Sequence, residues 1–397
     1  MKPINVLIYE AYPFNQVGGN LRTQGYIMKF VDRTKFNLVL LSPREIDFTR
    51  KMREEGIDTV ILPPSKRINR YGGNCLRDGF TGKFLTIIDL FRYNLQVLKV
   101  FKSKKIDIVY CNCIRAVLTV GLAAVLGKVP ILWYIKGSLD NRILDFIGFM
   151  ISRKILFFCE TNKNDKYPNL IKWYGRKVGI LKIGIDPQVI RELEAKDKTL
   201  LKKELDIDDY HINLIVLGQL YRPKGALYLI EALGMISQDF PKIRLYIVGD
   251  HITDEYKDYK NELINLIRLN KLTDKVVFTG WRKDALEIVS LMDILVHPSL
   301  SEGFGRAVLE AMALGKPVVV SKVGGLREII KDGENGFLVE PKDSRAIAEK
   351  LTLLLQNKSL RNKLGKEARN AVFSEYLLPD KILQLEQIWS DMVKEKK

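Results

Sequence analysis

The chain has 397 residues, of which 47% are hydrophobic and 28% are charged, the composition of a soluble globular protein too long for a single ordinary core. No stretch reaches the roughly 18 uncharged apolar residues that a membrane-spanning helix needs; Lys128 and Pro130 interrupt the nearest one, residues 116–133. The net charge is +17, and residues 1–180 carry 30 Lys and Arg against 14 Asp and Glu. This excess predicts an anionic partner for the first half, such as a membrane surface or a phosphorylated lipid, with a solvated basic surface as the alternative.

Nucleic acid is not an expected partner, because basic runs such as residues 102–105 end a helix and do not alternate with aromatic residues. The four cysteines, Cys75, Cys111, Cys113 and Cys159, show no disulfide or metal spacing, which fits a reducing cytoplasm. Residues 1–14 have the pattern of a first strand, not of a signal peptide. We therefore expect a cytoplasmic protein that could associate peripherally with the inner face of the cell membrane.

Short β-branched runs alternate with helical patterns along the chain. The first set of runs lies at residues 4–9, 36–41, 59–63, 106–111, 129–134 and 155–159. The second set lies at residues 212–218, 243–249, 275–280, 293–298, 317–321 and 336–341. Near-continuous apolar strands separated by helices are typical of parallel sheets covered on both faces. The expected fold class is therefore α/β, with two doubly wound, Rossmann-like domains facing a central cleft.

A turn-rich stretch at residues 183–188 separates the two sets, and a charged helix is predicted at residues 192–205. We predict an N-terminal domain over residues 1–187 and a C-terminal domain over residues 188–378. The tail, residues 379–397, has the pattern of one amphipathic helix that can pack back on the first domain. Since ligands of open parallel sheets bind at the carboxyl ends of strands, the expected site is the cleft between the domains.

Two features of the first half could face a membrane or an acceptor. Residues 84–105 form an apolar helical pattern that could lie on a membrane, although such a helix more often covers a sheet. Residues 63–82 are basic and long for a loop in a compact domain, which makes them a candidate for contacting a phosphorylated lipid.

The stretch SLSEGFGRAVLEAMALGKPVVVS, residues 299–321, combines two glutamates with a glycine-rich helix start. A helix that begins near residues 304–306 would offer free amide groups to an anion, and glycines let the backbone approach a ligand closely. The carboxylate of Glu310 can accept hydrogen bonds from hydroxyl groups on the same side. The pattern therefore suits a nucleotide-sugar clamp, with a simple loop-to-helix cap, Glu302 lying near the helix dipole, as the alternative.

Residues 302–339, EGFGRAVLEAMALGKPVVVSKVGGLREIIKDGENGFLV, closely resemble the signature of the retaining GT-B glycosyltransferases of family four, the group 1 glycosyltransferases. Further matches are GQLYRPKG (218–225), VGD (248–250), FTG (278–280) and VGGNLR (17–22). The resemblance covers essentially the whole chain and is strong over residues 214–341. It implies a GT-B fold, a nucleotide-diphosphate sugar as donor and same-face transfer, and it says little about which sugar is moved.

The resemblance also implies roles for individual residues. Glu310 would bind the ribose hydroxyls, Glu302 the hydroxyls of the donor sugar, and Lys224 would neutralise the diphosphate. Backbone contacts to the donor are implied for Gly18, Gly19, Gly303, Phe304 and Gly305, and base recognition is expected near Gly249, Gly280 and Arg282. No metal or other cofactor is implied, because the positive helix end and Lys224 would stabilise the leaving diphosphate. The domain at residues 188–378 would bind the donor, and the domain at residues 1–187 the acceptor.

Two positions depart from the family pattern. Gln219 stands where the family usually has an arginine, and Arg222 is the nearest possible replacement. Lys136-Gly137 stands where the family often has His-Gly, and the three histidines all lie in the second half. Lys136 either contacts sugar or acceptor as a charged donor or is an ordinary surface lysine. Glu302, Lys224 and Lys136 are thus the predicted catalytic residues, whereas His297 is expected to form only a local structural hydrogen bond.

The expected function is that of a metal-independent, retaining hexosyltransferase. It would transfer a sugar to a hydroxyl of a glycan or lipid-linked acceptor in cell-envelope polysaccharide synthesis. Gln219 and Lys136 motivate one alternative, a nucleotide-sugar-binding protein with little activity. Another GT-B enzyme, such as an epimerase or a phosphorylase, is the other alternative.

Overall fold

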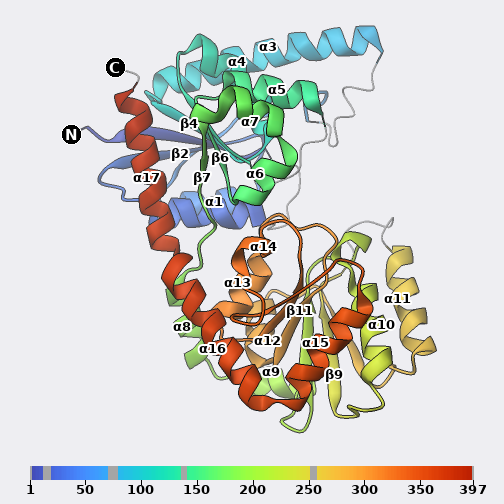
Figure 1. Ribbon diagram of the computed structural model, residues 1–397. Coiled ribbons are helices and arrows are strands. Elements are labelled where there is room, and N and C mark those ends of the chain that lie inside the picture. The colour runs from blue at the N-terminus through green and yellow to red at the C-terminus, as the bar shows by residue number, and fades with distance from the viewer. Residues whose placement is uncertain (1, 12–18, 70–78, 136–140, 251–256, 396–397) are drawn as a thin grey trace. The chain divides into compact units, whose positions relative to one another are not determined.

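The computed structural model describes residues 2–11, 19–69, 79–135, 141–250 and 257–395 (Figure 1). The chain divides into two compact units, one formed by Met1–Lys182 with Pro379–Lys397 and the other by Ile183–Leu378. Each unit is built on one parallel sheet. In the described part of the chain, no helix is long and apolar enough to cross a membrane.

The sheet of the first unit has seven strands in the order β3-β2-β1-β4-β5-β6-β7, and every neighbouring pair is parallel. The strands are β1 (Ile4–Tyr9), β2 (Phe36–Ser42), β3 (Asp58–Ile61), β4 (Ile108–Cys111), β5 (Ile131–Ile135), β6 (Lys154–Phe157) and β7 (Val178–Ile180). The first six were predicted from their apolar runs. The strand β7 was missed because it has only three residues, with a glycine in the middle, and so lacks such a run.

Helices cover both faces of this sheet: α1 (Gly19–Phe30), α2 (Asp47–Glu54), α3 (Phe80–Ser103), α4 (Ile114–Leu126), α5 (Arg142–Ile151), α6 (Glu160–Lys166), α7 (Pro168–Tyr174) and α17 (Leu378–Lys394). Buried residues of α3, α4 and α5 share one apolar cluster with Tyr9 and Val109. Since side chains alternate along a strand, Phe36 and Tyr110 point to the opposite face. There the fully buried Trp389 of α17 packs edge-on, with its ring centroid 5.4 Å from that of Phe36 and 6.3 Å from that of Tyr110.

The sheet of the second unit has six strands in the order β10-β9-β8-β11-β12-β13, again all parallel. The strands are β8 (Ile212–Leu217), β9 (Ile243–Val248), β10 (Val276–Gly280), β11 (Ile294–His297), β12 (Val318–Ser321) and β13 (Phe337–Val339). All six were predicted. In both sheets the strand order reverses beside the first strand, which creates a topological switch point between β1 and β4 and another between β8 and β11.

The helices of the second unit are α8 (Pro187–Ala195), α9 (Thr199–Glu204), α10 (Ala226–Ile236), α11 (Lys257–Leu269), α12 (Ala285–Leu291), α13 (Arg306–Ala313), α14 (Leu326–Ile329), α15 (Ser344–Gln356) and α16 (Lys358–Glu375). The single helix predicted at residues 192–205 is wrong, since α8 and α9 divide this segment. The cause is Asp197, whose carboxylate accepts hydrogen bonds from the amide and the hydroxyl of Thr199. Such a local side-chain turn competes with helix continuation.

The packing of α17 on the first sheet gives a stability prediction. Trp389→Ala should remove about 3–5 kcal/mol from the free energy of unfolding, because it opens a cavity between α17, Phe36 and Tyr110. The control is Leu383→Ala on the same helix, which removes a side chain that is 61% exposed and should change stability by no more than about 0.5 kcal/mol. Urea denaturation followed by circular dichroism measures both. Equal, small losses would mean that α17 does not hold this sheet.

Candidate functional site

The candidate site lies at the switch point of the second unit, where the connections after β8 and β11 begin. The short 3₁₀ helix Arg222–Lys224 follows β8 and ends in Lys224. His297 is the last residue of β11, and Glu302 lies five residues further on. Because β8 and β11 are neighbours in a parallel sheet, their carboxyl ends bring these two connections together at one edge.

The carboxylate of Glu302 is the centre of this site. Its Oε2 accepts hydrogen bonds from Lys224 Nζ and from His297 Nε2, each at 2.7 Å, and its Oε1 accepts one from the amide of Gly303 at 3.1 Å. The Oγ of Ser299 lies 3.0 Å from the same His297 nitrogen. The side chains of Lys224, Glu302 and His297 are 21%, 15% and 3% exposed. A carboxylate can only accept, so Nε2 of His297 must carry a proton in this arrangement.

The surroundings of Glu302 keep it ionised. Burial by itself would raise the pKa of this carboxyl group, because it disfavours the charged form. The hydrogen bond and the charge of His297, together with the charge and hydrogen bond of Lys224, outweigh burial and hold the pKa of Glu302 well below its ordinary value. At neutral pH the site therefore presents a fixed, partly buried carboxylate next to a cation.

Glycines let three connections pack tightly around Glu302. Gly225 has φ +68°, and a Cβ added to it would lie 2.0 Å from the carbonyl oxygen of Pro298. Gly324 has φ +49°, and its Cβ would lie 1.8 Å from the carbonyl oxygen of Glu302. A hydrogen bond of 2.8 Å from the amide of Leu300 to the carbonyl of Pro223 joins the same connections. Any side chain at Gly225 or Gly324 would force these backbones apart.

Helix α13 begins directly after this connection, with Gly305 at φ +95° as its N-cap. As at any helix start, the amides of its first turn lack carbonyl partners within the helix, which suits an anion. Glu310 lies in its second turn and is 8% exposed. Phe304 is buried, with its ring centroid 6.0 Å from that of Tyr376, and so fixes the entry of the chain into the helix.

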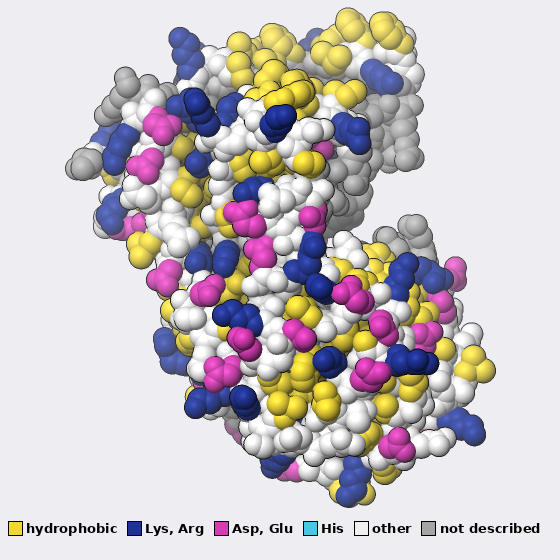
Figure 2. Space-filling view, viewed as in Figure 1, with side chains coloured by type: hydrophobic (Ala, Val, Ile, Leu, Met, Phe, Trp, Pro, Cys, Tyr) yellow, Lys and Arg dark blue, Asp and Glu magenta, His cyan; other side chains and the backbone are white. Residues whose placement is uncertain are grey.

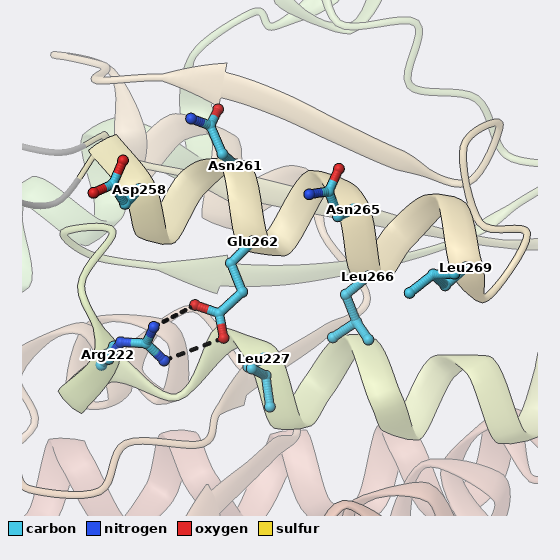
Figure 3. Close-up of a pocket in the computed structure, with 8 residues that line it drawn as sticks. All are labelled: Arg222, Leu227, Asp258, Asn261, Glu262, Asn265, Leu266 and Leu269. Atoms are coloured by element: carbon cyan, nitrogen blue, oxygen red, sulfur yellow. Dashed lines mark hydrogen bonds and ion pairs between the residues drawn. The ribbon is translucent and has the colours of Figure 1, made fainter.

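The structure does not bring Arg222 to the Glu302 cluster. Figure 3 shows the Arg222 guanidinium facing Glu262 of α11, with Nη2 2.7 Å from Oε2 and Nη1 3.1 Å from Oε1. Both residues line a groove of about 490 Å³ that runs along α11 beside the start of α10. The other residues drawn there are Leu227, Asp258, Asn261, Asn265, Leu266 and Leu269. The proposed replacement for the arginine missing at Gln219 is thus engaged elsewhere, and Gln219 itself is exposed.

The residues expected near the base lie at the ends of β9 and β10. Gly249 donates its amide to the carbonyl of Gly280 at 2.9 Å, which joins the two strand ends. Arg282 is held by two carboxylates, with Nη2 2.7 Å from Asp284 Oδ2 and Nη1 2.6 Å from Glu204 Oε1. The hydrogen bond to Asp284, and then that to Glu204, raise the pKa of Arg282. Its guanidinium therefore has little capacity left for a ligand.

Three predicted residues belong to the first unit. Gly18 and Lys136 lie outside the described residues, and Gly19 is the first residue of α1. The same sheet edge holds polar residues that sequence reasoning missed. Glu10 and Asn112 follow the register pair Tyr9 and Cys111 at the ends of β1 and β4, and both are buried.

Gln24 of α1 is also buried, and the side-chain amides of Gln24 and Asn112 have no hydrogen-bond partner in the described part of the chain. Burying an unpaired amide costs free energy, so such groups often bind a ligand or an ordered water molecule. The signal that could have found Glu10 and Asn112 is their position, since a polar residue directly after a buried parallel strand lies at the edge where ligands bind.

Residues 197–371 match the family described as glycosyl transferases group 1. This segment contains the entire Glu302 cluster, with Lys224, His297 and Glu310. Residues 197–371 therefore form a group 1 glycosyltransferase domain. The predicted resemblance is confirmed for this part of the chain, whereas the residue roles stay predictions.

Curated relatives of this chain are named for different reactions and products. It is 29% identical over 202 residues to N-acetyl-alpha-D-glucosaminyl L-malate synthase of Bacillus anthracis, and the match spans about half of each chain, 51%. It is 25% identical over 367 residues to the capsular polysaccharide biosynthesis glycosyltransferase CapM of Staphylococcus aureus, covering 88% of this chain and 93% of CapM. It is 25% identical over 380 residues to UDP-Gal:alpha-D-GlcNAc-diphosphoundecaprenol alpha-1,3-galactosyltransferase of Escherichia coli, covering 89% and 91% of the two chains.

Solved structures share the fold of this chain. The Anabaena protein Alr3699/HepE in complex with UDP has a TM-score of 0.78 at 18% identity, over 98% of this chain and 100% of its own. A glycosyltransferase from Rickettsia africae has a TM-score of 0.83 at 18% identity, over 99% and 100% of the two chains. These likenesses confirm the predicted α/β class with two doubly wound sheets, the GT-B architecture.

His297 provides the first prediction for this site. Replacing it by Leu should lower the free energy of unfolding by about 1.5–3 kcal/mol, because Glu302 loses a hydrogen bond made by a charged group in a buried place. His297→Gln keeps a side-chain N–H donor, so its free energy of unfolding should fall by less than that of His297→Leu. Urea denaturation of both variants measures the difference. Equal losses would make His297 a packing residue with no bearing on Glu302.

The depressed pKa of Glu302 predicts a pH effect. The folded pKa lies below the ordinary value of 4.5, so the ionised carboxylate adds stability that is fully present above pH 4.5 and is lost as the pH falls below it. Wild type should therefore lose part of its stability advantage over Glu302→Gln as the pH is lowered from 6 to 3. Thermal denaturation of the two proteins across this range tests it, since all other carboxylates are common to both. A constant difference between them would contradict the predicted shift.

Proposed function

We propose that this protein is a metal-independent, retaining glycosyltransferase that moves a hexose from a nucleotide-diphosphate sugar to a hydroxyl of a glycan or lipid-linked acceptor in cell-envelope polysaccharide synthesis. The observation that carries the proposal is the Glu302 cluster. It combines a fixed carboxylate, an adjacent ammonium group and a helix start at the switch point of a parallel sheet. A diphosphate sugar needs a cationic place for its phosphates and an acceptor for its hydroxyls, side by side.

The donor would rearrange this cluster. Lys224 Nζ would turn from Glu302 to the diphosphate, where it meets two negative charges instead of one. Glu302 would stay in place because His297 and the Gly303 amide still hold it, and its freed Oε2 would accept a hydrogen bond from a sugar hydroxyl. Glu310 would accept from the ribose hydroxyls, and the first-turn amides of α13 would add to the diphosphate site. The backbone at Gly303, Phe304 and Gly305 would line it.

Same-face transfer would need no protein nucleophile. The bond between C1 of the sugar and the diphosphate oxygen breaks, the bond between C1 and the acceptor oxygen forms on the same face, and the departing phosphate takes the acceptor proton. Lys224 and α13 would stabilise the charge that develops on the diphosphate, the part that a metal ion plays in other transferases. UDP-sugars are the first donors to test, since the Anabaena neighbour binds UDP and the E. coli relative is named for UDP-Gal.

The first unit would receive the acceptor. The buried side-chain amides of Gln24 and Asn112 could form hydrogen bonds with the hydroxyl groups of the acceptor sugar. Lys136 is the residue predicted to contact the acceptor with a charged N–H group. The S. aureus and E. coli relatives are named for capsular polysaccharide and for a diphosphoundecaprenol acceptor, which supports an envelope glycan or a lipid-linked one. We place the reaction in the cytoplasm, at the inner face of the membrane.

Donor binding and turnover test the proposal. A UDP-sugar at about 100 times its dissociation constant should add about 2.7 kcal/mol and raise the melting temperature of wild type by a few degrees. Glu310→Gln should lose most of this shift and most of the transfer to a lipid-linked acceptor. The matched control, Glu334→Gln, alters an exposed carboxylate of the same unit and should behave as wild type.

A second function, nucleotide-sugar binding with little turnover, is favoured by the exposed Gln219 and the engaged Arg222. The same experiment separates the two. A donor-dependent shift without sugar transfer to any acceptor would support the binding protein. A donor shift that survives Glu310→Gln unchanged would contradict the proposed donor site.

A further inference from the structure

Four helices of the first unit carry most of the large hydrophobic side chains that the described residues expose to solvent. They are α3, α4, α5 and α7, and α3 packs on α4, α4 on α5 and α5 on α7 (Figure 1). Their inner residues belong to the apolar cluster that covers one face of the seven-stranded sheet. Figure 2 shows hydrophobic side chains gathered over this helical layer, with Lys and Arg side chains among them.

The first two thirds of α3 carry an exposed stripe of five large apolar residues. They are Phe80, Phe84, Ile87, Phe91 and Leu95, between 41% and 86% exposed. Their spacing of three or four residues places them on one side of the helix. The buried residues of α3, Tyr93, Asn94, Val97 and Phe101, begin only toward its second half. The stripe is therefore not needed to cover the sheet.

The apolar surface continues on the neighbouring helices. Its further members are Leu122, Val125 and Leu126 on α4, Ile143, Phe146 and Met150 on α5, and Trp173 on α7. The second unit, by contrast, exposes such residues singly on separate elements, for example Met235 on α10 and Leu353 on α15. Contiguous exposed apolar surface marks an interaction site, whereas scattered residues do not.

The exposed charges on the four helices all have the same sign. Their exposed charged residues are all basic: Lys83, Arg92, Lys99, Lys102, Arg142 and Lys172. Of their two carboxylates, Asp145 is buried and Asp89 lies 3.3 Å from the guanidinium of Arg67. The surface thus joins aromatic and aliphatic side chains to long basic ones without an exposed acidic group.

We propose that this surface, formed by α3, α4, α5 and α7, docks the protein on an anionic phospholipid bilayer. Apolar side chains would enter the boundary between headgroups and acyl chains, and the flexible lysines and arginines would reach the phosphates. The charge pattern favours a lipid surface over a second copy of this chain, since two such surfaces would bring only like charges together. The inference rests on the proposed function in one respect: a lipid-linked acceptor would be met at this surface.

Vesicle sedimentation tests the docking surface without donor or acceptor. Full-length protein is mixed at low ionic strength with phosphatidylcholine vesicles that contain or lack phosphatidylglycerol. Wild type should partition at least tenfold better onto the anionic vesicles. Ile87→Gln/Phe91→Gln should lower that partition at least tenfold, because two anchoring side chains are lost from the interface. The matched control Met235→Gln/Leu353→Gln makes the same kind of change on the second unit and should leave it within twofold.

A second pair of variants tests the charges. Each cation near an anionic surface improves binding about fivefold, so Lys83→Glu/Arg92→Glu should lower the partition at least about 25-fold. Lys363→Glu/Lys366→Glu reverses two exposed lysines of α16 and should change it far less. Equal binding to both kinds of vesicle, or equal losses in surface and control variants, would overturn the proposal. So would a wild-type dimer in light scattering that Ile87→Gln/Phe91→Gln converts to a monomer.

Thermal shift by UDP on the same variants keeps the two proposals apart. We expect all of them to retain the shift of wild type, because none of these residues lies in the donor site. Vesicle binding without any nucleotide shift would count against the proposed donor and leave the docking surface standing. A nucleotide shift without preference for anionic vesicles would support the proposed donor and contradict the docking surface.

Discussion

The second unit depends on the hydrogen bonds that one carboxylate, that of Glu302, accepts at the edge of the sheet where the candidate site lies. Glu302 receives Lys224 from the connection after β8, His297 from the end of β11 and the amide of Gly303 from its own connection. A buried carboxylate is tolerated only when its oxygens are paired, so this arrangement ties the two connections at the switch point to each other. The same pairing places an ammonium group and a fixed acceptor within a few ångströms, which is what a diphosphate sugar requires.

Backbone geometry makes the pairing possible. Gly225 and Gly324 let carbonyl groups of neighbouring connections approach to distances that no other residue would allow, and Gly305 turns the chain into α13 with a positive φ. These glycines hold the carboxylate, the cation and the helix start in one place before any ligand arrives. Preorganisation of this kind lowers the cost of reorganising charges when a substrate reacts. The apolar and basic surface of α3, α4, α5 and α7 is a separate feature, since the proposal for it concerns a bilayer and not the donor.

Much of the fold could be predicted because parallel strands buried on both faces leave long apolar runs, as at β1 and β8. Where no such run exists, as at β7, prediction failed, and Asp197 divided a helix that periodicity had joined. The resemblance to the family pattern singled out Glu302, Glu310 and Lys224, whose roles stay predictions. His297 was expected to form a local structural hydrogen bond, but its partner Glu302 could not be predicted, because the contact depends on how the connection after β11 folds. Arg222 was expected to replace the arginine missing at Gln219, but it forms an ion pair with Glu262 of α11. That pairing could not be predicted, because Glu262 lies 40 positions away in the sequence.

Calorimetric titration of UDP into wild type, Lys224→Met and Arg222→Met tests most directly whether the Glu302 cluster is the diphosphate site. Both variants remove one cation from the same short 3₁₀ helix, but only Lys224 is paired with Glu302, whereas Arg222 is paired with Glu262. We expect Lys224→Met to weaken binding at least about tenfold, the loss of a charge-assisted hydrogen bond of about 1.4 kcal/mol or more, and Arg222→Met to bind nearly as wild type. An affinity that depends on Arg222 as much as on Lys224, or on neither, would contradict this assignment.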